Sequence, residues 1–183
     1  MSAETTHPRL VEPQSDLADS YRALVREFVE RGEDLIPFTL AFEAEPFSRY
    51  LEKLAACAKG EGIPATFVPH STFWLVDGAE VVGVSNVRHR LTASLERNGG
   101  NIGFSIRPSR RGERLARVLL RESLGRAAAL GVHESWLTCA KTNVASAHTM
   151  LSCGGVLVSE EYIESRKEVV QRYRIPLEPR RER

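Results

Sequence analysis

Apolar residues recur along the chain with two different periods, and these periods predict a fold that mixes helices and strands. Spacings of three and four residues between apolar positions, typical of amphipathic helices, occur at 17–32, 47–60, 115–130 and 144–151. Short runs rich in β-branched and aromatic residues predict strands at 7–12, 72–76, 80–87, 101–107, 135–139, 156–160 and 167–175. The predicted order is one strand, two helices, three strands, a helix, a strand, a helix and two strands.

The residues between these segments are typical of turns. Asp77-Gly78 joins two predicted strands and is a hairpin signal. Gly99-Gly100 closes the loop before the strand at 101–107, and Gly131 follows the third helix as a C-terminal glycine would. No internal repeat or low-complexity tract interrupts the pattern.

A basic turn joins the strand at 101–107 to the helix at 115–130. Its residues 110–114 are Arg-Arg-Gly-Glu-Arg, at the start of the helix. Backbone N–H groups at that end have no partner within the helix, and the helix dipole adds partial positive charge. Such an end binds phosphate, and neighbouring arginines strengthen the attraction. Solvated arginines in a surface turn explain the pattern equally well, and the residues alone do not name the anion.

Composition narrows the classes of function. A chain of 183 residues suits one domain with a sizeable core. A net charge of +1 argues against a nucleic-acid partner, because binding of phosphate backbones needs a basic excess. Three cysteines without metal-ligand spacing indicate a reducing compartment and no metal site. No apolar run reaches membrane-spanning length and residues 1–14 lack a signal pattern, so we expect a cytoplasmic protein without a membrane partner.

The basic turn resembles the acetyl-CoA-binding motif of the GNAT superfamily of N-acetyltransferases. That motif is Arg or Gln, two residues, Gly, one residue, then Gly or Ala, at the start of the helix after the central strand. Arg111 and Ala116 match it, whereas Arg114 stands where the family has its first Gly. Gly112 is a candidate for supplying loop flexibility two residues earlier. Alternatively, the loop differs in shape, or Arg114 adds a charged contact to the phosphates.

Three further segments carry the resemblance, which covers nearly the whole chain. They are Asn86-Val87-Arg88-His89 after a predicted strand, Ile-Gly-Phe-Ser-Ile-Arg-Pro-Ser at 102–109, and Asn-Val-Ala-Ser at 143–146. Together they are most similar to a group of uncharacterised predicted acetyltransferases.

The resemblance implies an α/β (α+β) domain over residues 1–176, with a mixed, mostly antiparallel sheet flanked by helices, and a basic tail over 177–183. It implies that the strands at 101–107 and 135–139 splay apart and hold the pantetheine arm of acetyl-CoA between them. The implied activity is direct transfer of an acetyl group from the co-substrate acetyl-CoA to a primary amine of a small molecule or peptide. A GNAT-fold module that binds acyl-CoA without catalysis is the alternative. A homodimer is compatible with the resemblance.

On the same basis we expect the cofactor to contact the central strand, the basic turn and the helix start at 143–146. The expected residues are Phe104, Ser105, Ile106, Arg111, Gly112, Glu113, Arg114, Leu115, Ala116, Asn143 and Ser146. Asn143 also suits a helix N-cap, and both roles can hold at once. Seven residues after Asn143, where the superfamily often has a Tyr as general acid, this chain has Met150, which has no proton to give.

The sequence does not identify the general base. His89 is the best-placed candidate, because it follows a predicted strand and the ordinary pKa of histidine suits proton transfer near neutral pH. A structural histidine in a loop is the alternative. Asn101 stands near the position at which many relatives carry a catalytic Glu, but an amide can only position a water. An acceptor amine of modest pKa could instead lose its proton to a chain of waters.

Overall fold

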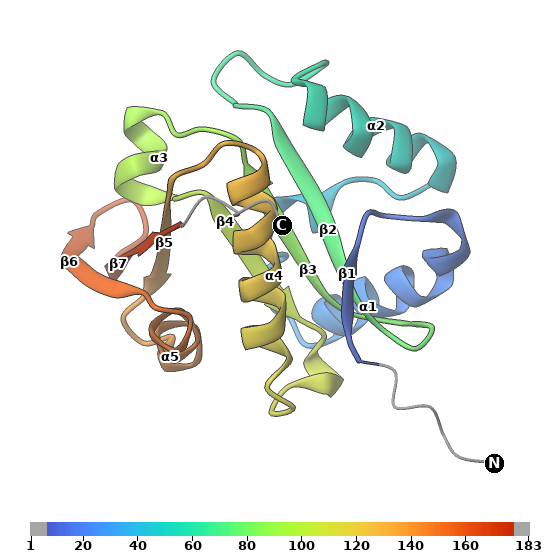
Figure 1. The fold of residues 1–183 in the computed structure, drawn as a ribbon. Helices are drawn as coiled ribbons and strands as arrows, with labels where there is room; N and C mark the ends of the chain where they lie inside the picture. The colour runs from blue at the N-terminus through green and yellow to red at the C-terminus, as the bar shows by residue number, and fades with distance from the viewer. Residues whose placement is uncertain (1–6, 178–183) are drawn as a thin grey trace, which may run out of the picture.

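The computed structural model describes residues 7–177, which form two antiparallel sheets with helices packed against them (Figure 1). The first sheet has the strand order β1-β2-β3-β4 and the second has the order β5-β7-β6. The strands are β1 (Arg9–Val11), β2 (His70–Asp77), β3 (Glu80–Arg88), β4 (Ile102–Ile106), β5 (Glu134–Ala140), β6 (Val156–Ile163) and β7 (Glu168–Pro176). The helices are α1 (Ala18–Glu30), α2 (Phe47–Lys59), α3 (Ala93–Asn98), α4 (Leu115–Ala129) and α5 (Val144–Ser152).

Two hydrophobic cores lie on opposite faces of the first sheet. Successive side chains of a strand point to opposite faces, so Trp74 and Val76 of β2 pack with α1 and α2, whereas Phe73 and Leu75 pack with α4. Tyr21 of α1 stacks on Trp74 with 4.7 Å between ring centroids. Figure 1 shows α4 lying along its face of the sheet. The alternating pattern of β2 therefore holds helices on both sides.

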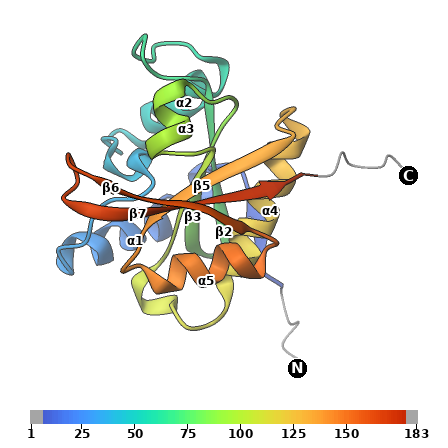
Figure 2. The same cartoon turned by 90° about the vertical axis from the view of Figure 1, so that its left-hand side faces the viewer.

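The two sheets meet at one end of β4 and β5. Gly100 forms a bridge with Leu137, and Asn101 donates its N–H to the Trp136 carbonyl at 2.6 Å. The Asn101 Oδ1 accepts the Trp136 N–H at 2.9 Å. Beyond this junction, β4 and β5 do not pair over their described residues, and the second sheet turns away (Figure 2). The predicted splay of the two central strands is therefore confirmed.

The predicted order of elements and the α/β fold are confirmed, with two differences of detail. The short helix α3 (Ala93–Asn98) lies in a stretch that the sequence pattern assigns to a loop; the Thr92 side chain caps it by accepting the Leu95 N–H. Strand β2 begins at His70 instead of residue 72, because its first residues pair with the end of β3. Within residues 7–177, no helix has both the length and the apolar character needed to cross a membrane. Most of the predicted basic tail, residues 178–183, lies outside the described residues.

Gly100 allows the close contact between the two sheets, and this gives a first prediction. Its φ is +79°, and a Cβ at this position would lie 2.1 Å from the Trp136 carbonyl oxygen. We expect Gly100→Ala to lower the free energy of unfolding by about 2–4 kcal/mol, because the clash is with backbone that cannot move aside. Urea unfolding of the purified variant measures the change.

Gly125→Ala is the matched control. Gly125 lies on the exposed side of α4, and a Cβ there meets no atom within 4 Å. Alanine is the better helix former, so this variant should gain roughly 0.5–1 kcal/mol. Equal stability of Gly100→Ala and the wild type would show that the junction tolerates a side chain.

Candidate active site

The edge of β4 that faces β5 is open. On its other edge, Arg107 donates its N–H to the Val82 carbonyl of β3 at 2.9 Å. Backbone groups alternate between the two edges of a strand, so the N–H and C=O groups of Phe104 and Ile106 point into the gap. Ser105, paired with β3, turns its backbone groups the other way. Two of the three residues predicted to hold a pantetheine arm thus turn backbone groups toward the gap, and of these the Ile106 carbonyl also accepts a hydrogen bond from Arg111 Nε at 3.3 Å.

The loop between β4 and α4 presents a run of unpaired backbone donors. Over the part of the chain that the structure describes, the N–H groups of residues 112–116 have no acceptor. Gly112 has a φ of 89° and Arg114 a φ of 61°, both in the left-handed region. Arg114 is the exposed N-cap residue of α4. The backbone here has the conformation that glycine favours, although the motif glycine is replaced.

Most arginine side chains of this loop bind carboxylates of the protein itself. These ion pairs tie the loop to α1, to the segment after α1 and to the β2–β3 hairpin. Such contacts fix the loop in place before any ligand arrives. The pairs include Arg107–Glu27 at 2.6 Å, Arg107–Glu80 at 2.8 Å, Arg110–Asp77 at 2.7 Å and Arg111–Glu33 at 2.6 Å.

The guanidinium of Arg111 is therefore already engaged. Besides two bonds to Glu33, at 2.6 and 3.0 Å, its Nε donates to the Ile106 carbonyl at 3.3 Å. These bonds from Arg111 lower the pKa of the Glu33 carboxyl. Among the described residues near the loop, the exposed Arg114 and Arg117 have no ion-pair partner. Arg111 braces the loop in this structure, and a direct role of its side chain in phosphate binding stays a prediction.

The helix start predicted to contact the cofactor is capped as expected. Asn143 precedes α5, and its Oδ1 accepts the Ser146 N–H at 3.1 Å. Asn143 is exposed and Ser146 is half-buried, so both are open to solvent. Met150 is 1% exposed and belongs to the core that packs on α4. The N-cap role of Asn143 is present, while contact with a cofactor stays a prediction for both polar residues.

A cavity of about 390 Å³ lies where β2 begins and β3 ends. We call it the Arg88 pocket. It lies close to the central strand, because a Cβ on Gly103 of β4 would come within 3.4 Å of the Pro37 Cβ, and Phe38 is the next residue. Its lining residues are Phe38, Thr66, Phe67, Val68, His70, Arg88, Thr92, Ser94 and Leu95.

Buried polar side chains lie beside this pocket. Nδ2 of Asn86 donates to Nδ1 of His70 at 2.9 Å and to Oγ1 of Thr72 at 3.1 Å. His70 is 2% exposed, and burial, helped by the positive charge of Arg88, lowers its pKa from 6.5 to about 4. His70 is thus neutral at pH 7. Sequence reasoning missed it, because only the pairing of β2 with β3 brings it beside Asn86.

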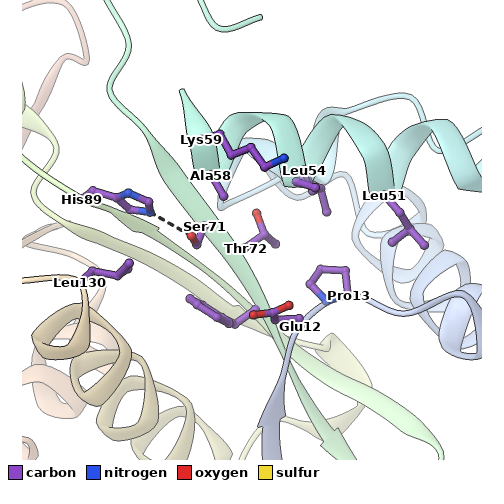
Figure 3. A pocket seen from close by; sticks show the side chains of 12 residues that line it. Glu12, Pro13, Leu51, Leu54, Ala58, Lys59, Ser71, Thr72, His89 and Leu130 are labelled. Carbon is purple, nitrogen blue, oxygen red and sulfur yellow. Dashed lines mark hydrogen bonds between the residues drawn. The ribbon is translucent and has the colours of Figure 1, made fainter. Parts of the chain in front are cut away.

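His89, the predicted general base, lies in a different pocket (Figure 3). Its Nε2 is 2.9 Å from the Ser71 Oγ, and its backbone N–H donates to the Pro69 carbonyl. Burial lowers its pKa. Strand alternation directs His89 to the face opposite Arg88. The structure therefore does not place His89 among the residues that line the Arg88 pocket, and its role as base stays a prediction.

Comparison with known protein families identifies the class. Residues 9–156 match the model of the acetyltransferase (GNAT) domain, and the chain belongs to this family of acyltransferases. The resemblance noted in the sequence is thereby confirmed. Comparison with the curated proteins gave no match.

Solved structures of acetyltransferases share the fold at low sequence identity. An acetyltransferase from Salmonella typhimurium that modifies the N-terminal serine of a 50S ribosomal subunit protein is 14% identical, with a TM-score of 0.65 over 96% of this chain and 97% of that one. A putative acetyltransferase from the same organism, solved with its cofactor acetyl-CoA, is 14% identical, with a TM-score of 0.61 over 93% and 94%. The dodecameric spermidine N-acetyltransferase of Vibrio cholerae is 17% identical, with a TM-score of 0.59 over 96% and 95%.

The low pKa of His70 predicts how the free energy of unfolding changes with pH. The unfolded chain takes up a proton at this residue below about pH 6.5, whereas the folded protein does so only near pH 4. Stability contributed by neutral His70 is therefore complete above pH 6.5 and is lost as the pH falls towards 4. We expect this residue to account for a loss of at most about 3 kcal/mol in the free energy of unfolding over that interval.

Replacing His70 measures its contribution to the loss of stability at low pH. His70→Gln should flatten the fall in stability between pH 6.5 and 4, measured by urea unfolding at several pH values. His148→Gln, which changes an exposed histidine on α5, should leave the profile unchanged. The same slope in His70→Gln and wild type would contradict the assignment.

Proposed function

We propose that this protein is an N-acetyltransferase that moves the acetyl group of acetyl-CoA directly to a primary amine of a small molecule or peptide. One observation carries the proposal: the unpaired N–H groups of residues 112–116 lie next in the chain to the open edge of β4. The first feature suits a diphosphate and the second suits an extended, amide-containing arm. Acetyl-CoA joins these two chemical parts in one molecule.

The arm supplies the geometry of the reaction. Lying along β4, it would exchange hydrogen bonds with Phe104 and Ile106, the residues whose backbone groups face the gap. One of these N–H groups would then donate to the thioester carbonyl and stabilise the negative charge that develops on its oxygen. Holding the thioester beside the acceptor removes most of the entropic cost of the encounter. In this proposal the backbone does the work, so the side chains of β4 carry little signal of the function.

Proton transfer in this reaction does not require a dedicated general acid of the protein. The amine attacks as a free base and loses a proton, and the departing thiolate needs no strong acid, because a thiol ionises not far above neutral pH. Met150 cannot donate a proton, so we propose that water protonates the thiolate. His89 remains the candidate base, acting through intervening water. Asn143 and Ser146 would contact the pantetheine arm at the start of α5.

The proposal extends to the setting of the enzyme. We propose that residues 1–176 act as one domain in the cytoplasm on soluble amines, without nucleic acid or membrane as partner. A homodimer is compatible with this function. The alternative, a module that binds acyl-CoA without turnover, is favoured only by the buried Met150 and by Arg114 at the motif glycine.

A proline at position 104 tests the role of the open edge. Phe104→Pro removes a backbone N–H that points into the gap and leaves the bonds between β4 and β3 intact. Phe104→Ala is the control, because it removes the same ring and keeps the N–H. We expect the proline variant to bind acetyl-CoA, or to release CoA with an amine, about 10–100-fold less well than the alanine variant.

Calorimetry with acetyl-CoA and an assay of CoA release across an amine panel separate the possible results. Equal behaviour of the two variants would remove the backbone of Phe104 from the mechanism. Tight binding of acetyl-CoA without release of CoA from any amine would support the non-catalytic module. Absence of binding to the folded protein at millimolar acetyl-CoA would contradict the proposal as a whole.

A further inference from the structure

Arg88 carries a half-buried positive charge that no carboxylate of the described residues neutralises. Its guanidinium donates to the Gly100 carbonyl at 2.9 Å and lies 5.7 Å from the centre of the Phe38 ring. Within residues 7–177 no carboxylate forms an ion pair with it, in contrast to Arg107 and Arg111. Burial lowers its pKa, and no acidic neighbour opposes that effect. A guanidinium has five N–H donors, so most of them remain available.

The surroundings of Arg88 favour an anion. The described residues that line the Arg88 pocket include no Asp or Glu. His70, the other titratable residue of the lining, is held neutral partly by the charge of Arg88. Removing a cation from water without a partner is costly, and a pocket that does so gains most from a ligand of opposite charge.

The walls of the Arg88 pocket are largely apolar and favour a ligand with an apolar part. Phe38, Phe67, Val68 and Leu95 supply aromatic and aliphatic surface. The rings of Phe38 and Phe67 meet edge to face with 5.6 Å between their centroids. A ligand here would have an anionic group at Arg88 and an apolar part against these side chains.

We propose that the Arg88 pocket binds the acceptor, and that this acceptor is an α-amino acid with an apolar side chain whose carboxylate pairs with Arg88. The inference rests on the proposed acetyl transfer and names its substrate class. The planar guanidinium matches a carboxylate with two parallel hydrogen bonds. The pocket lies close to β4, along which the thioester would lie, because its lining residue Phe38 follows Pro37 and a Cβ on Gly103 would be 3.4 Å from the Pro37 Cβ. The amine nitrogen then bonds to the acetyl carbon, the C–S bond of the thioester breaks and CoA leaves as the thiolate, and the proton lost by the nitrogen passes to water.

The same pocket disfavours other amines. A polyamine carries only positive charges and would meet the guanidinium of Arg88 with no carboxylate in the described lining to attract it. A purely structural role for Arg88, holding the Gly100 carbonyl at the junction of the sheets, is the competing account. The two accounts differ in whether the charge of the substrate matters.

Matched substrates test the proposal on the wild-type protein. L-phenylalanine, L-phenylalaninamide and 2-phenylethylamine share one ring and one primary amine, and only the first carries a carboxylate. We expect kcat/KM for phenylalanine to exceed that for each of the other two by about 10–100-fold. The amide has the less basic amine and hence more of it in the reactive free form. A preference for the acid over the amide therefore cannot come from the amine itself.

Variants assign the preference to Arg88. Arg88→Met should reduce the ratio of acid to amide to about one, and Arg88→Lys should retain part of it, because a lysine keeps the charge and loses the paired geometry. Arg90→Met makes the same change at an exposed arginine two residues away and should keep the ratio. A structural role would lower turnover of all three substrates together without changing the ratio.

Calorimetry of phenylalanine with the CoA-saturated protein keeps the two proposals apart. Binding of phenylalanine that is lost in Arg88→Met, without turnover, would support this pocket and contradict acetyl transfer. Turnover of other amines with no preference for phenylalanine over its amide, or with spermidine as the best substrate, would overturn the assignment of Arg88 and leave the acetyltransferase proposal standing. Loss of phenylalanine turnover in Arg90→Met to the same degree as in Arg88→Met would also overturn it.

Discussion

The structure depends on one junction, where the buried amide of Asn101 joins the two sheets. Its Oδ1 accepts from Trp136 of β5, its backbone N–H donates to the carbonyl of the same residue, and its Nδ2 reaches the Arg88 carbonyl of β3 at 3.5 Å. Asn101 is 2% exposed. Buried polar groups must be paired, and the side-chain oxygen, side-chain nitrogen and backbone N–H of Asn101 each have a partner. Pairing between β4 and β5 does not continue beyond this end of β4. The gap between the sheets exists because the strands are held together at only one end.

Ion pairs around the loop after β4 hold that loop in position. Carboxylates of α1, of the segment after it and of the β2–β3 hairpin bind Arg107, Arg110 and Arg111. The arginine side chains thereby position the loop, and the backbone N–H groups of residues 112–116 are left as its open donors. A basic motif can thus act chiefly through its backbone, with its arginines holding the loop and its N–H groups left without acceptors.

Arg88 shows the opposite arrangement within the same fold. It is half-buried beside neutral His70, and no carboxylate lines its pocket among the described residues, whereas Arg107, Arg110 and Arg111 of the loop are each paired. A half-buried arginine without a carboxylate partner places positive charge where an anionic ligand can pair with it. The Asn101 junction adjoins Arg88, because the Asn101 side chain bonds to the Arg88 carbonyl as well as to the Trp136 N–H of β5.

The order of helices and strands and the position of the strand–turn–helix at 101–130 could be predicted from the sequence, because local periodicity encodes both. It also located the turn whose backbone N–H groups are free, since the motif register placed Arg114 at a position that the structure finds left-handed. Which side chains contact one another depends on the folded arrangement of distant segments. Glu33 pairs with Arg111, which is 78 residues away in the chain. The pairing of β2 with β3 brings His70 beside Asn86. His89 lines a different pocket. Periodicity constrains which face a residue takes, but the partners on that face come from distant segments, which no local pattern encodes.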